Sequence, residues 1–151
     1  MTLRLSSPLR DAVVSNYGLG AMMTGGHIQV YSGTQPDTAD MPPTGTLLAF
    51  ITQDGLPIAL PGESDDSGLM MQLGTNAGEL TNAGSWVLVG KASGEPGWWR
   101  FVGEPVDTGA AATTECRIDG AVTDSFSPAL GPISPSTVFA LGEFLISLPY
   151  Q

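Results

Sequence analysis

Glycine and proline residues divide this chain into short apolar segments, and this division limits the folds that are open to it. The 151 residues include 20 glycines and 12 prolines, which lie mostly between the apolar runs. At such positions a positive or a fixed φ makes turns and prevents a strand from continuing. Short apolar runs separated by turn residues are typical of antiparallel sheets. The sequence therefore predicts a mainly β protein, an antiparallel β-sandwich of a jelly-roll-like kind.

Two neighbouring segments show the clearest strand patterns. Residues 27–31 alternate, with Ile28 and Val30 on one face and the other three side chains on the opposite face. Residues 47–51 are continuously apolar, as expected for a strand that is covered on both faces. We expect the two segments to pair across the loop between them.

Further short runs predict the rest of the sheets. The predicted strands are "GLMMQL", "SWVLVG", "GWWRFVG", "ECRIDGAV" and "TVFALGEFLISL". Two polar, glycine-rich segments are interpreted instead as mobile loops or assembly arms, "QDGLPIALPGESDDSG" and "GTNAGELTNAG".

The N-terminal region predicts a short helix. Ser7 can cap a helix with its side-chain oxygen, and Pro8 suits the first helical position. Leu9, Val13 and Tyr17 then recur at four-residue spacing and form one apolar stripe. We expect an arm and helix over about residues 1–24, attached to a single β domain that spans residues 1–151.

The charge balance excludes several classes of partner. The net charge is −10, with 15 acidic and 5 basic residues, so the surface repels phosphate backbones and anionic lipids. The longest apolar segment is also too short to span a membrane. We therefore expect neither a nucleic-acid nor a membrane partner, and a surface rich in small neutral residues suits protein contacts.

Catalytic and cofactor motifs are weak. His27 is the single histidine and Cys116 the single cysteine, so no internal disulfide can form. Neither residue has the context of a known nucleophile, and we interpret His27 as the surface end of a strand and Cys116 as a small buried residue. The "GLGAMM" segment lacks the third glycine of a dinucleotide fingerprint. The sequence predicts no enzyme and no cofactor; a glycan hydrolase with a carboxylate pair is the catalytic alternative.

Acidic residues gather in two places. Glu63, Asp65 and Asp66 form one cluster, and Asp37 with Asp40 forms a thinner one. Neither has the spacing of a calcium-binding EF-hand. We interpret both as solvated acidic loops and predict no metal site, with weak divalent-cation binding as the alternative.

The aromatic pair in "GWWRFVG" divides between two faces. Strand alternation places Trp99 and Phe101 toward the core. Trp98 then shares the other face with Arg100, where it can stack beneath the guanidinium group. We therefore keep Trp98 and Arg100 as candidate contacts for a partner.

The sequence blocks "IQVYSGTQPDTADMPPTGTLLAF", "GEPGWWRFVGEPVDTG" and "RIDGAV" resemble a family of small virion structural proteins of tailed bacteriophages. The resemblance spans most of residues 7–148. It implies a structural role in the particle, most simply as a capsid decoration or cement protein on the outer capsid surface, made in the host cytoplasm. The implied partners are the major capsid protein or other virion subunits, and a homo-oligomer such as a trimer. A tail, neck or fibre component, or a receptor-binding module, is the alternative.

The loop from Thr34 to Gly45 is the predicted assembly surface. Its prolines reduce the ordering entropy that is lost when it docks, and deletion of residues 37–43 is expected to leave the fold intact but to abolish binding to the particle. The predicted partner-contact residues are Thr34, Gln35, Pro36, Asp37, Asp40, Pro42, Pro43, Trp98 and Arg100.

Overall fold

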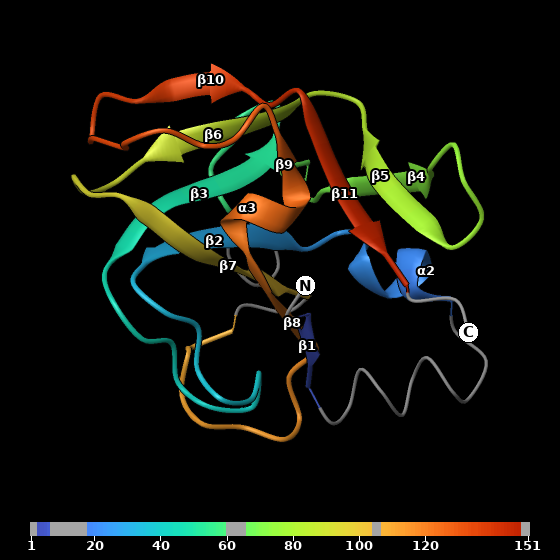
Figure 1. Cartoon of the computed structure of the whole chain (residues 1–151), viewed down its shortest axis with the longest axis horizontal. Helices are drawn as coiled ribbons and strands as arrows, with labels where there is room; N and C mark the ends of the chain where they lie inside the picture. The colour runs from blue at the N-terminus through green and yellow to red at the C-terminus, as the bar shows by residue number, and fades with distance from the viewer. Residues whose placement is uncertain (1–2, 7–17, 60–65, 104–106, 149–151) are drawn as a thin grey trace.

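The computed structural model describes residues 3–6, 18–59, 66–103 and 107–148, and these form two antiparallel β-sheets (Figure 1). The larger sheet has seven strands in the order β1 (Arg4–Leu5), β8 (Arg117–Ala121), β7 (Pro96–Val102), β2 (His27–Ser32), β3 (Leu47–Gln53), β6 (Trp86–Gly90) and β10 (Val138–Ala140). The smaller sheet has the order β4 (Met70–Leu73), β5 (Glu79–Ala83), β11 (Glu143–Ser147) and β9 (Phe126–Ser127). The mainly β prediction is confirmed.

The centre of the larger sheet follows the predicted pattern. Strand β2 pairs with β3 on one side and with β7 on the other, and Ile28 lies opposite both Ile51 and Phe101. Ile28 and Val30 are completely buried on the inner face. The predicted pairing of the two strands across the intervening loop is confirmed.

One hydrophobic core joins side chains from both sheets. Phe144 of β11 lies at its centre, with ring centroids 5.2 Å from Trp86 and 5.0 Å from Trp99. Aromatic side chains bury large apolar areas, so this cluster supplies much of the burial that holds the two sheets together. Trp99 and Phe101 belong to this core, as their alternation in the sequence predicts.

Two short helices accompany the sheets. Helix α2 (Leu19–Met23) begins after Gly18 without a side-chain cap, and helix α3 (Val122–Ser125) follows β8 directly. The predicted helix capped by Ser7 falls on residues 7–17, which lie outside the described residues. In the part of the chain that is described, no helix is long and apolar enough to cross a membrane.

The structure differs from the sequence interpretation in two segments, one interpreted as a loop or arm and one predicted as a single strand. The "GTNAGELTNAG" segment contains β5, which is paired on both sides, with β4 and with β11. Its own alternation is weak, and the strand depends on these two neighbours. The segment "TVFALGEFLISL" forms two strands, because the chain leaves the larger sheet after Ala140 and enters the smaller one at Glu143.

Candidate functional site: a loop anchored by buried arginines

Residues 33–46 form a long loop between β2 and β3, which we call the 33–46 loop. Gly33 and Gly45 both have positive φ, of 77° and 79°, which favours glycine at the two ends of the loop. The base is closed by a hydrogen bond from the Ser32 N–H to the Thr46 carbonyl, at 3.0 Å. A second bond, of 2.9 Å, runs from the Thr46 N–H to the Ser32 hydroxyl.

The strand register brings charged side chains together beneath this loop. Asp119 of β8 lies opposite Arg100 of β7, and Arg100 lies opposite Gln29 of β2. Paired residues point to the same face of a sheet. Because Trp99 and Phe101 fill the inner face, Arg100 and Asp119 lie on the outer face.

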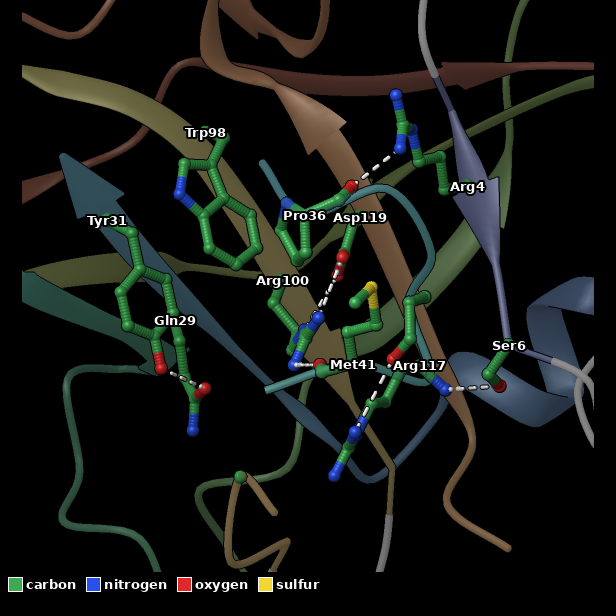
Figure 2. A network of polar contacts seen from close by, with 12 residues as sticks. Arg4, Ser6, Gln29, Tyr31, Pro36, Met41, Trp98, Arg100, Arg117 and Asp119 are labelled. Carbon is green, nitrogen blue, oxygen red and sulfur yellow. Dashed lines mark hydrogen bonds and ion pairs between the residues drawn. The ribbon is translucent and has the colours of Figure 1, made fainter. Parts of the chain in front are cut away.

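Arg100 and Asp119 form a buried bidentate ion pair (Figure 2). The Nε and Nη2 atoms of Arg100 donate to the two carboxylate oxygens of Asp119 at 2.7 and 2.8 Å. The two side chains are 1% and 0% exposed. The remaining nitrogen, Nη1, donates to the Met41 carbonyl at 2.9 Å, so the ion pair holds the 33–46 loop directly.

Arg117 holds the same loop from β8. Its guanidinium group is paired with Asp107 at 2.5 Å, and it also donates to the Ala110 carbonyl at 2.8 Å. Its Nη1 atom lies 3.4 Å from the carbonyl oxygens of both Ala39 and Asp40. Arg117 therefore joins the 33–46 loop to the neighbouring 107–116 segment, which lies beside it in Figure 1.

Arg4 of β1 makes the third contact of this kind. Its Nη1 atom donates to the Pro36 carbonyl at 2.6 Å (Figure 2). Its ion pair with Asp37 is weak, because the two groups are 3.8 Å apart and the Asp37 side chain is 96% exposed. Three of the chain's 5 basic residues thus donate hydrogen bonds to carbonyl groups of the 33–46 loop.

Trp98 completes the support of the loop. Its indole N–H donates to the Thr44 carbonyl at 3.2 Å, and its ring stacks on Tyr31 with centroids 4.7 Å apart. The Arg100 guanidinium carbon lies 5.4 Å from the Trp98 ring, as the shared face predicts. However, Trp98 and Arg100 are each only 1% exposed. The 33–46 loop covers both, so they position the loop and present no surface of their own to a partner.

The buried carboxyl groups of Asp119 and Asp107 have pKa values that are shifted in opposite directions. Burial raises the pKa of Asp119 above its usual value, and its bonds to Arg100 only partly oppose this. Burial also acts to raise the pKa of Asp107, but hydrogen bonds from Arg117 and from the Gly109 N–H outweigh it and lower the pKa. The Asp107 carboxylate, paired with Arg117, therefore keeps its charge in more acidic solution than the Asp119 carboxylate, paired with Arg100.

The outer side of the 33–46 loop is open to solvent. Pro36 and Ala39 are buried, whereas Asp37, Met41 and Pro42 are exposed. A hollow of about 520 Å³ is lined by Thr34, Gln35, Pro36, Asp37, Met41, Pro42, Pro43 and Thr44. Six of the nine predicted contact residues line this hollow, while Asp40 lies half-buried beside it.

His27 and Cys116 are the two residues that the sequence offered for nucleophilic chemistry. His27 begins β2 and is buried at 8% exposure, edge-on to Phe50 at 5.7 Å, so its assignment to the surface was wrong. Cys116 is half-buried before β8. Burial, together with the nearby Glu115 carboxylate, raises the pKa of its thiol. Reactive cysteines have a lowered pKa, so Cys116 is poorly suited to attack a substrate.

The acidic clusters show no metal site within the described residues, where no three potential ligands gather. Asp66 is exposed, while Glu63 and Asp65 lie outside those residues. Asp37 and Asp40 belong to the 33–46 loop, and the Asp40 carbonyl accepts a bond from the Ala112 N–H at 3.0 Å.

Comparisons with protein-family models, with curated proteins and with solved structures found no match. Sequence reasoning missed Arg4, Arg117, Asp107 and Asp119 as parts of it. For Arg117 and Asp119 the available indication was their place inside a short strand, because charged residues are rarely buried unless they are paired. Asp107 lies outside the strands and gave no such indication.

Proposed function

We propose that this protein is a non-enzymatic virion structural protein of a tailed bacteriophage, which decorates the capsid and stabilises the head shell. The anchoring of the 33–46 loop by Arg4, Arg100 and Arg117 carries this proposal. Long loops without secondary structure are uncommon in compact domains and are usually functional when they are ordered. A loop held in place before binding also loses less entropy when it docks.

The surface chemistry of the loop supports a protein partner. Asp37 offers an exposed charge, while Met41 and Pro42 offer exposed apolar area beside it. A net charge of −10 disfavours the DNA-filled interior of a capsid and favours its outer surface. The proposed partner is the major capsid protein or another virion subunit, which would contact the loop through a basic and apolar surface.

The proposal also covers the topology of the two sheets, the oligomeric state and the location of the protein. The two sheets share one core, which supports a sandwich, and we propose a jelly-roll-like connectivity for it. Capsid surfaces repeat the same site many times, so a homo-oligomer would add modest contacts by avidity. Synthesis in the host cytoplasm and assembly on the virion follow from the proposed role.

Point substitutions test the loop better than its deletion does. Removal of residues 37–43 would also remove the carbonyl groups that Arg100 and Arg117 bind, and would leave buried donors without acceptors. The side chains of Asp37 and Met41 point outward and can be changed without the loss of these bonds. Asp37→Lys and Met41→Asp are therefore the informative variants, with Leu73→Asp on the exposed part of β4 as the matched control.

The assay is co-sedimentation of purified protein with capsids assembled without it. The wild type and Leu73→Asp should bind at a fixed stoichiometry, and Met41→Asp should bind about 30-fold more weakly, the loss expected for a hot-spot residue. Circular dichroism confirms that each variant is folded. Equal binding by all variants would refute the role of the loop. Binding to tails or host cells but not to capsids would refute the decoration role.

A further inference from the structure

The outer edge of the larger sheet is formed by β10, at the end of the sheet away from β1 and β8. Figure 1 shows β10 along this edge, beside β6. Val138 and Phe139 are 63% and 39% exposed. Natural proteins protect such edges with charged residues, prolines, bulges or very short strands, and β10 has three residues. Here residues 125–142 contain no charged side chain, and β6 contains none either.

The hydrogen-bond pattern shows which groups of β10 face outward. The Gly90 N–H donates to the Thr137 carbonyl and the Leu141 N–H donates to the Trp86 carbonyl, each at 2.8 Å. In an antiparallel pair, hydrogen-bonded positions alternate with positions that are not bonded. Thr137, Phe139 and Leu141 therefore face β6 with their peptide groups, while the peptide groups of Val138 and Ala140 point away from the sheet.

We propose that β10 pairs with β10 of a second copy of this chain, antiparallel and across a two-fold axis at Phe139. Under that symmetry Val138 lies opposite Ala140 of the other copy, and each of these positions can exchange both of its peptide hydrogen bonds. The two Phe139 side chains face each other at a position without hydrogen bonds, where side chains of paired strands come closest. The pairing would thus satisfy the outward peptide groups and cover the exposed aromatic ring.

Charge favours a second copy over a foreign partner at this edge. Two molecules that each carry a net charge of −10 repel one another over most of their surfaces. The β6 and β10 strands lack charged side chains, so they allow close approach of like molecules. A different protein would bind an acidic protein more strongly at a surface that carries charged side chains than at this uncharged edge. The proposal does not depend on the proposed function, because the 33–46 loop is anchored at the other end of the sheet.

The apolar area continues from the edge onto the outer face. Val138 lies opposite Val89, and Val89 lines a hollow of about 270 Å³ together with Phe50, Leu56 and Ile58. Lys91 also lines this hollow, with its Nζ atom 5.6 Å from the centroid of the Phe50 ring. Leu56 is itself 40% exposed. A three-residue strand with this adjoining surface is small for an interface. We therefore expect a dimer with a dissociation constant in the micromolar range, and not the trimer considered from the sequence.

Sedimentation equilibrium of the full chain tests the proposal. The wild type should be mostly dimeric at about 200 μM, and Phe139→Glu should dissociate at least tenfold more readily, because two like charges would then face each other. Leu73→Glu adds the same charge at the exposed β4 edge and should leave the dimer unchanged. A wild type that is monomeric or trimeric at this concentration would overturn the proposal.

Cross-linking provides an independent test of the register. Facing residues at a position without hydrogen bonds have Cα atoms about 4.5 Å apart, which a disulfide can bridge. In a Cys116→Ser background, Phe139→Cys should therefore give a covalent dimer on mild oxidation. Leu73→Cys is more exposed and serves as the collision control. Cross-linking of Phe139→Cys no faster than that of Leu73→Cys would contradict the proposed two-fold axis.

Discussion

Replacement of Arg100 by methionine removes one partner of the buried ion pair while keeping a side chain of similar length. Asp119 would then lie at 0% exposure without its hydrogen-bonded partner, with Arg117 and Arg4 acting on its charge only from farther away, and the Met41 carbonyl would lose its donor. Removing one partner of a buried pair costs about 3–5 kcal/mol, because the remaining charge stays desolvated. We expect Arg100→Met to lose about 4 kcal/mol of unfolding free energy.

Urea denaturation followed by tryptophan fluorescence measures this loss. Small proteins have m-values of about 1–3 kcal/mol per M in urea, so a loss of 4 kcal/mol moves the midpoint by at least about 1.3 M. Because burial already raises the pKa of Asp119, protonation relieves part of the penalty in the variant. The loss should therefore be smaller at pH 5 than at pH 8.

The double variant Arg100→Met with Asp119→Leu separates the ion pair from the packing. Replacement of both partners by apolar residues of similar size is often nearly neutral. The double variant should recover at least about 2 kcal/mol of the loss. Its 33–46 loop should still be cleaved faster by protease than that of the wild type, because Met41 remains without its donor. A loss below 1 kcal/mol in Arg100→Met would refute the claim that a dry ion pair anchors the loop.

Three further predictions concern other parts of the molecule. Because Asp107 has a lowered pKa, its contribution is complete above the unfolded value of about 3.9 and is lost as the pH falls through the folded value. The stability difference between the wild type and Asp107→Asn should thus shrink below about pH 4 in denaturation titrations. Gly120→Ala should lose about 1–3 kcal/mol in thermal unfolding, since a Cβ there would lie 2.5 Å from the Trp99 ring, and no loss would contradict this packing. Cys116 should react several-fold more slowly with an aromatic disulfide at pH 8 than a cysteine in an unfolded peptide, whereas an equal rate would show an unperturbed thiol.

Local patterns in the sequence determined most of the larger sheet. Alternation at Ile28 and Val30, and the continuous apolar run from Leu47, depend on a side-chain period of two that any strand must follow. The same rule placed Trp99 in the core and Trp98 on the opposite face. These features could be predicted because each depends on residues that are close together in the chain.

Only the tertiary structure decided what covers the outer face. The sequence left Trp98 and Arg100 open to a partner, yet both are buried beneath the 33–46 loop, where Arg100 donates to the Met41 carbonyl, 59 residues away, and Trp98 to the Thr44 carbonyl. Strand β5 likewise exists because β4 and β11 supply its hydrogen bonds. Such contacts join groups that are distant in the chain, and their free energy depends on burial, which local spacing does not specify.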